Sequence, residues 1–240
     1  MTQNDPAQQA AFADAIERHD LVVKILLEEV RPDYAHSKKE FELLTVAFKV
    51  QVNKLRNALQ LIEEQRAKSP SPPAYLAEYA QTLRARAEAC ARQFLTFLAT
   101  QEGLALQTSD KIHQADVLKL KADFNRYLCE VIEPGAGEVL HAEIEELYRA
   151  SIALLDTVED KYFARKLAAQ LNCAVFAFEV RRQRREGLRL LTAVYEQFLG
   201  DYGRLGEEVL KECSPVFKII DESLKAWQKE AGSDRKGQAF

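Results

Sequence analysis

The chain has 240 residues, of which 47% are hydrophobic and 29% are charged, enough to build one large core or two small ones. With only 9 glycines and 7 prolines, the composition argues against a sheet-rich or disordered protein. The net charge of -4 argues against a general nucleic-acid binder, which is usually basic.

The four cysteines are far apart in the sequence, and none forms a CxxC pair. We therefore expect free, reduced thiols in an intracellular protein. The sequence shows no apolar leader at its amino end and no uncharged apolar run of membrane-spanning length. It indicates a soluble, cytoplasmic protein, and we expect no cofactor.

Helical periodicity predicts nine helices separated by short segments rich in Pro, Gly, Ser or Asp. The predicted helices are 5–18, 19–30, 38–68, 74–102, 111–132, 138–157, 161–184, 187–202 and 207–230. Asp5, Asp20 and the segment 108–110 are predicted to cap the first, second and fifth helices. The clearest loop is 69–73 (SPSPP). Short connections favour antiparallel neighbours, and we expect one domain over 1–230 with a flexible tail at 231–240.

The helix at 38–68 carries two neighbouring stripes of side chains. The stripe predicted to be buried consists of Leu43, Leu44, Ala47, Phe48, Gln51, Leu55, Ala58, Leu59 and Ile62. The second consists of Val46, Lys49, Val52 or Asn53, and Arg56. Lys49 and Arg56 are two turns apart, or about 10 Å along the axis. For an isolated pair of this kind, a solvated face is favoured over an anion site.

The helix at 111–132 has an apolar stripe and a polar side. The residues predicted to face inward are Val117, Leu120, Phe124, Leu128 and Val131. Lys119, Asp123, Arg126 and Tyr127 share one side of this helix by spacing, and Asp123 can brace Arg126 or Tyr127. Cations from two such helices can converge on one anion, but spacing alone does not establish that they do.

Other motifs give no support to catalysis or to a metal site. The four histidines form no HExxH motif, and His141-Ala142-Glu143 lacks the paired cysteines of a deaminase. The segment 134–137 (PGAG) lacks the GK[ST] ending of a phosphate loop. The basic run 181–185 can bind RNA or an acidic partner, although we favour its simpler role as the end of the seventh helix. We therefore expect neither an enzyme nor a nucleic-acid binder.

Three segments carry a resemblance to a known family. The segments 43–50 (LLTVAFKV), 123–130 (DFNRYLCE) and 171–179 (LNCAVFAFE) resemble segments of the 14-3-3 family, and 214–227 is a weaker match. The order of the helices and of their breaks agrees over about residues 5–230. The resemblance implies an all-α fold in which nine antiparallel helices form a concave cup with an amphipathic groove.

The resemblance also implies a function, the binding of phosphoserine or phosphothreonine segments of client proteins. It assigns the phosphate-binding residues to Lys49, Arg56, Arg126 and Tyr127. Arginine forks suit phosphoryl oxygens and lysine adds a point charge. The residues implied to line the peptide groove are Val46, Lys119, Leu171, Asn172, Val175, Glu179, Ile219, Ser223 and Trp227.

Three positions depart from the family pattern inside the implied groove. Ser223 stands where the family has an asparagine, Ala226 where it has a leucine, and Gln60 where it has an arginine. We therefore expect an altered sequence preference or a lower affinity. The alternative is an all-α scaffold that binds unphosphorylated acidic or amphipathic segments.

The resemblance further implies a homodimer. The positions assigned to its interface are Phe12, Ile16, Arg18, Ala58, Tyr79 and Arg86. Arg86 stands where the family has the acidic partner of Arg18, and the second ion pair of the family falls on Leu21 and Thr82. We favour a homodimer, weak or non-standard in the absence of these ion pairs. Exposed ion pairs contribute only about 0–1 kcal/mol each, and burial of an apolar patch at about 25 cal/mol per Å² can outweigh their loss.

Overall fold

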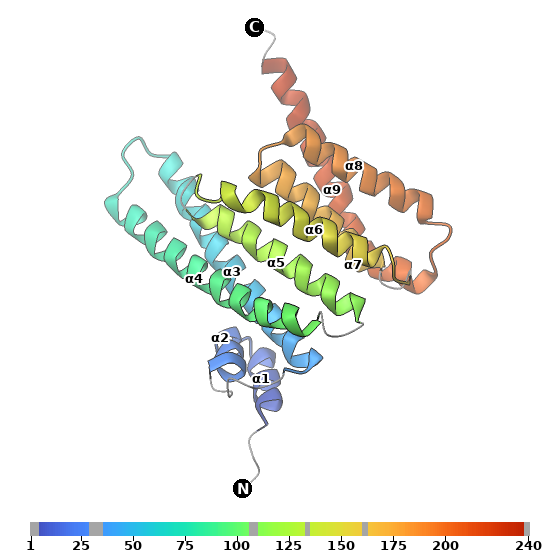
Figure 1. Cartoon of the computed structure of the whole chain (residues 1–240). Helices are drawn as coiled ribbons and strands as arrows, with labels where there is room; N and C mark the ends of the chain where they lie inside the picture. Colours follow the sequence, from blue (N-terminus) through green and yellow to red (C-terminus); the bar gives the residue numbers. More distant parts are fainter. Residues whose placement is uncertain (1–4, 29–35, 106–109, 133–134, 160–162, 238–240) are drawn as a thin grey trace. The chain divides into compact units, whose positions relative to one another are not determined.

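The computed structural model describes residues 5–28, 36–105, 110–132, 135–159 and 163–237. These ranges contain nine α-helices and no strand, which confirms the predicted all-α class (Figure 1). The helices are α1 (Pro6–Ala15), α2 (His19–Val23), α3 (Lys38–Ala67), α4 (Ala74–Ala105), α5 (Lys111–Val131), α6 (His141–Leu155), α7 (Phe163–Val175), α8 (Arg184–Asp201) and α9 (Glu207–Gly237). None of these helices is long and apolar enough to cross a lipid bilayer.

The chain divides into two compact units, unit 1 (residues 1–94) and unit 2 (residues 95–240), and the division falls within α4. The predicted single domain and the predicted cup with its groove stay predictions.

The core of unit 1 is built on α3. A capping box starts this helix, since the Ser37 side chain accepts from the Glu40 backbone and the Glu40 carboxylate accepts from the Ser37 backbone. Leu44 and Phe48 are buried as predicted, and Phe48 stacks on Phe94 of α4 with ring centroids 4.7 Å apart. The segment 69–73 joins α3 to α4 as a largely exposed loop, as predicted.

The amino-terminal part of unit 1 differs from the prediction in two places. Asp5 caps α1 as expected by accepting from the Ala7 backbone at 3.0 Å. Asp20 is not the N-cap of α2, because it lies in the first turn of this helix, where its side chain pairs with Arg18. The second helix then widens into a π-helical segment, Lys24–Glu28. Its predicted end at 31–33 lies outside the described residues. At the other end of the unit, α4 continues past its expected stop at Gly103 to Ala105.

In unit 2, α5 and α6 lie side by side (Figure 1). Asp110 caps α5 by accepting from the backbones of Ile112 and His113. All five residues of the predicted inward stripe of α5 are buried. Ser151 of α6 ties the two helices together by donating from Oγ to the Ala115 carbonyl at 2.8 Å.

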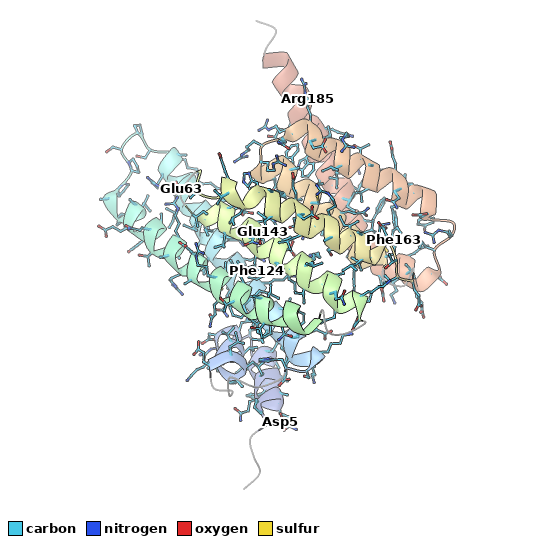
Figure 2. The ribbon with its side chains drawn as sticks, in the orientation of Figure 1. Asp5, Glu63, Phe124, Glu143, Phe163 and Arg185 are labelled. Carbon is cyan, nitrogen blue, oxygen red and sulfur yellow. The ribbon has the colours of Figure 1, made fainter. Side chains whose placement is uncertain are left out.

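The larger core of unit 2 is formed by α7, α8 and α9, and Figure 2 marks Phe163 at the start of α7. Its buried residues are Phe163, Leu167, Leu171, Ala174, Phe178, Leu191, Val194, Phe198, Leu205, Cys213, Ile220, Leu224 and Trp227. Gly187 lets α8 approach the segment that follows α7, because a Cβ at this position would lie only 2.5 Å from the Phe178 Cβ.

Several predicted boundaries in unit 2 were wrong. The segment 138–157 begins with a short 3-10 turn, Glu138–Leu140, before α6. The seventh helix passes into a π-helical segment, Phe176–Val180, and ends there rather than at Arg184, which begins α8. The last helix runs to Gly237 rather than to Glu230.

Candidate anion-binding site

The central side chain of the candidate site in unit 2 is Arg126 of α5, which is only 7% exposed. Its Nη1 donates to Glu130 Oε1 at 2.9 Å, and its Cζ lies 4.7 Å from the centre of the Tyr127 ring. Among the described residues, the buried Nε has no hydrogen-bond partner. Because a guanidinium has five N–H donors, Arg126 keeps donor capacity at Nε that no described residue uses.

The charge of Arg126 is stable in this buried position. Burial acts to lower the pKa of Arg126, but nearby tyrosines and carboxylates outweigh burial and raise the pKa above its usual value. These groups are Tyr148, Tyr127, Glu130 and Asp123. Arg126 therefore keeps its positive charge, which its neighbours stabilise, although it is largely shielded from solvent.

One turn before Arg126 lies Asp123, which is 1% exposed. Its Oδ2 accepts from Lys119 Nζ at 2.7 Å, and its Oδ1 accepts from Tyr148 Oη and from Asn172 Nδ2, each at 2.7 Å. We call these four residues the Asp123 cluster. Since they come from α5, α6 and α7, the cluster fixes polar side chains of three helices around one buried carboxylate.

The Asp123 cluster adds partners that the sequence prediction did not include. We expected Asp123 to brace Arg126 or Tyr127: the ion pair of Arg126 is with Glu130, while the charge of Asp123 also helps to raise the pKa of Arg126. Burial, and next the charge of Asp123, raises the pKa of Tyr148 well above its usual range, so its hydroxyl remains a donor. Tyr148 and Glu130 were both missed. Glu130 follows Arg126 at the helical i, i+4 spacing and could have been found from it, whereas no sequence signal points to Tyr148.

In unit 1, α3 presents the other predicted cations. Lys49 and Arg56 are half-buried and Val46 is exposed. Arg56 Nη1 donates to Asn53 Oδ1 at 3.0 Å, while Val52 is fully buried, so Asn53 is the member of the cation stripe. Lys49 and Arg56 belong to unit 1, whereas Arg126 and Tyr127 belong to unit 2. That these four side chains gather around one anion therefore stays a prediction.

The predicted groove residues of unit 2 differ in how much surface they offer. Leu171 and Trp227 are each 6% exposed and belong to the core of α7, α8 and α9. Val175 and Ser223 are half-buried, and Glu179 and Ile219 are exposed. Of the apolar groove residues in this unit, Ile219 and Val175 therefore offer the most surface to a ligand.

Two of the positions that depart from the family pattern are exposed. Gln60 donates from Nε2 to Glu64 Oε1 at 3.0 Å within α3, and Ala226 faces solvent on α9.

The side chains predicted for a dimer interface are mostly exposed on unit 1. Phe12 is 68% exposed and Tyr79 is 59% exposed, with Ile16 also open to solvent. Arg86 is exposed and Ala58 is half-buried. Arg18 binds Asp20 of its own chain through Nε at 2.8 Å and Nη2 at 2.7 Å, so this arginine already has a local carboxylate.

The basic run 181–185 begins with Arg181 at the C-cap of the segment that ends the seventh helix, as expected, but its last two arginines belong to the start of α8. Arg181 forms an ion pair with Glu145 of α6, and Arg184 pairs with Glu230 of α9 at 2.7 Å. Arg182 and Arg185 are exposed, and Figure 2 marks Arg185 at the beginning of α8. Two of the four arginines therefore connect helices.

A metal site finds no support within the described ranges, where no group of three or more potential ligands is close enough to hold an ion. His141 packs edge-on against Phe176, and burial, followed by the charge of Arg181, lowers its pKa.

The fold and the site together define an all-α protein with a buried, incompletely satisfied arginine beside a tyrosine and a fixed cluster of polar side chains.

Comparison with known proteins identifies the family. The model of the 14-3-3 protein family matches residues 9–228. The chain is 24% identical to 14-3-3-like protein 1 of Caenorhabditis elegans, with 99% of this chain and 96% of that protein covered. It is 23% identical to 14-3-3 protein beta/alpha-1 of Oncorhynchus mykiss, covering 98% and 96%, and 22% identical to 14-3-3 protein zeta of Xenopus laevis, covering 99% and 98%. The chain belongs to the 14-3-3 family, of which it is a divergent member.

Proposed function

We propose that this protein is an adaptor that binds phosphoserine or phosphothreonine segments of client proteins. Membership of the 14-3-3 family supports a phosphopeptide-binding adaptor role in general, and it supports an adaptor without catalysis. One observation supports the assignment of this role to particular residues: the Nε of the buried Arg126 has no partner among the described residues. A phosphoryl group carries about -1.5 to -2 charges and three strong acceptor oxygens.

In the proposed complex, the phosphoryl oxygens accept from the guanidinium of Arg126 and from the Tyr127 hydroxyl. Lys49 and Arg56 of α3 contribute further positive charge. Lys119 lies about two turns before Arg126 and Tyr127 on the same side of α5 and adds to the positive field. Asn172, Val175, Glu179, Ile219 and Ser223 are proposed to contact the chain on either side of the phosphorylated residue, together with the exposed Val46 and the edges of Leu171 and Trp227.

The test is fluorescence anisotropy with a phosphoserine peptide and its unphosphorylated twin. We expect the phosphorylated peptide to bind at least 100-fold more tightly, about 2.7 kcal/mol, because the buried arginine offers its donors to a doubly charged acceptor. Equal affinity for both peptides would reject the proposal.

A changed sequence preference is part of the proposal. Ser223 is a shorter side chain than the asparagine of the family pattern, Ala226 removes apolar surface, and Gln60 already donates to Glu64. A library of phosphopeptides with varied flanking residues should give a ranking that differs from that of 14-3-3 protein zeta measured beside it. Identical rankings would remove this part of the proposal.

One observation favours a second candidate, a scaffold for unphosphorylated amphipathic segments. Ile219 is exposed on α9, where it can pack against an apolar side chain of a partner. The same peptide pair discriminates between the candidates, since this scaffold would bind both peptides alike.

We also propose a cytoplasmic homodimer. Exposed Phe12, Ile16 and Tyr79 offer apolar surface, and burial of such surface contributes about 25 cal/mol per Å². The described cysteines are free, as expected in a reducing compartment. Sedimentation equilibrium at micromolar concentration should show twice the chain mass of 27.2 kDa. A single species of the chain mass would end the dimer proposal.

A further inference from the structure

The Asp123 cluster holds a buried carboxylate that the proposed phosphate contacts do not use. Asp123 is 1% exposed, so it cannot itself be a major contact of a ligand. A buried carboxylate is costly unless it is well paired. The side chains that donate hydrogen bonds to Asp123 therefore indicate the role of this carboxylate.

The hydrogen bond to Asp123 fixes the orientation of the Asn172 amide. An ionised carboxylate can only accept hydrogen bonds, and the ammonium of Lys119 at 2.7 Å favours the ionised form. The amide of Asn172 must therefore direct Nδ2, and not Oδ1, toward Asp123, as it does at 2.7 Å. The carbonyl oxygen of Asn172 is then turned away from the carboxylate and can accept from a ligand.

The same carboxylate restrains Lys119. The side chain of Lys119 is 14% exposed, and its Nζ lies 2.7 Å from Asp123 Oδ2. A free lysine side chain loses about 2 kcal/mol of rotamer entropy when it is held in one conformation. Here this loss has already occurred before a ligand binds.

We propose that Asp123 is a positioning residue, which sets Asn172 to present its carbonyl oxygen to a backbone N–H of the client and holds Lys119 ready beside the anion. This inference rests on the proposed phosphopeptide function and deepens it. It adds a requirement on the client, since one particular backbone amide must carry a hydrogen.

The first test reads Asn172 in the ligand-free full-length protein by two-dimensional 1H–15N NMR of side-chain amides. The Asn172 signal is assigned by its loss in Asn172→Ala. We expect Asp123→Asn to shift this signal strongly, because the charged acceptor is lost. Ser151→Ala is the matched control, since it removes another buried hydrogen bond between α5 and α6 without touching the cluster. An Asn172 signal that stays in place in Asp123→Asn overturns the proposal.

The second test is a double-mutant cycle on phosphoserine-peptide affinity. We expect Asp123→Asn alone to weaken binding about tenfold, as for loss of a hydrogen bond to a charged group. In the Asn172→Ala background the same change should weaken binding threefold or less, because part of its effect acts through Asn172. A full tenfold loss in both backgrounds overturns the assignment to Asn172.

The third test needs no change at Asp123, so it applies even if Asp123→Asn does not fold, and it tests the client contact of Asn172 that Asp123 is proposed to set. A series of phosphopeptides carries one N-methyl group at each backbone nitrogen in turn. In the parent protein, N-methylation at one position should lower the affinity about tenfold. In Asn172→Ala, N-methylation at that same position should lower it less than twofold. If N-methylation at each position lowers the affinity equally in the parent and in Asn172→Ala, the proposal fails. If the parent does not discriminate phosphorylated from unphosphorylated peptide, the proposed function fails, while the NMR result still decides the role of Asp123.

Discussion

The ring of Trp227 lies flat against the ring of Phe178, with centroids 4.0 Å apart and planes 4° from parallel. Trp227 belongs to α9, and Phe178 to the π-helical segment that follows α7. The stack therefore links the last helix of the chain to the helix that carries Asn172.

The first prediction concerns this stack. Trp227→Ala should lower the free energy of unfolding by about 3–5 kcal/mol, because it leaves a large cavity in the core of unit 2. Urea unfolding followed by circular dichroism measures the change, since the only tryptophan is lost. Ile219→Ala is the control on the same helix and should change stability by less than about 0.5 kcal/mol, because its side chain is exposed. Comparable losses in both variants would contradict the buried stack.

The second prediction concerns Arg126. Arg126→Ala should cost about 2–5 kcal/mol of phosphopeptide binding, as when one partner of a buried charge contact is removed. Arg126→Lys should recover only part of the loss, because lysine lacks the planar fork. Fluorescence anisotropy measures both. Arg185→Ala removes the same charge from an exposed position and should change affinity less than twofold, so an equal effect there would reduce the role of Arg126 to general electrostatics.

The third prediction compares two glycines of α8. Gly187→Ala should destabilise the protein by about 1–3 kcal/mol, since its Cβ would meet the Phe178 Cβ at 2.5 Å and the Phe178 nitrogen at 2.8 Å. Gly200→Ala should stabilise it by about 0.5–1 kcal/mol, because nothing lies within 4 Å of the added Cβ. Thermal unfolding should give shifts of opposite sign. Two shifts in the same direction would contradict the close approach at Gly187.

The fourth prediction concerns the thiols. Burial raises the pKa of Cys90 and of Cys213 to about 11, and burial with the nearby Glu130 does the same for Cys129. Ellman's reagent at pH 8 should label the folded protein slowly and the urea-unfolded protein quickly, because the thiolate is the reactive form. Complete labelling of the folded protein at the unfolded rate would show that these thiols are accessible and ionised.

These raised pKa values also determine how the free energy of unfolding changes with pH. A pKa that is higher in the folded state stabilises the fold fully below the unfolded pKa of about 9, and this contribution is lost as the pH rises through about 11. The urea midpoint of the parent should therefore fall between pH 9 and pH 11. It should fall less in Cys213→Ala, and an identical fall in both would exclude a contribution from Cys213.

The fold class and most helix positions followed from the sequence because they depend on local patterns. The stripe of α5 was predicted correctly, as were the helix at α3 and the loop at 69–73. The two π-helical segments were missed, because apolar residues continue through both and no proline or glycine marks the change. The end of the seventh helix at Val180 likewise has no local breaker.

The candidate site was predictable only in part, because spacing groups residues within one helix but not residues of different helices. Arg126, Tyr127 and Lys119 share one helix face, so spacing groups them. Asn172 is 49 residues from Asp123, and Tyr148 is 25 residues from it. Contacts at such separations depend on how α5, α6 and α7 pack, which spacing within one helix cannot specify. The partners of the buried carboxylate therefore became known only with the fold.

The loop at 69–73 has a practical consequence. Its four residues from Pro70 to Pro73 are exposed, and exposed loop tips tolerate insertion better than buried backbone does. A short epitope or a fluorescent label genetically inserted between Ser71 and Pro72 should leave the capping box of α3 and the cores of both units intact. Such a tagged chain would allow client binding to be followed in living cells without a fusion at either end.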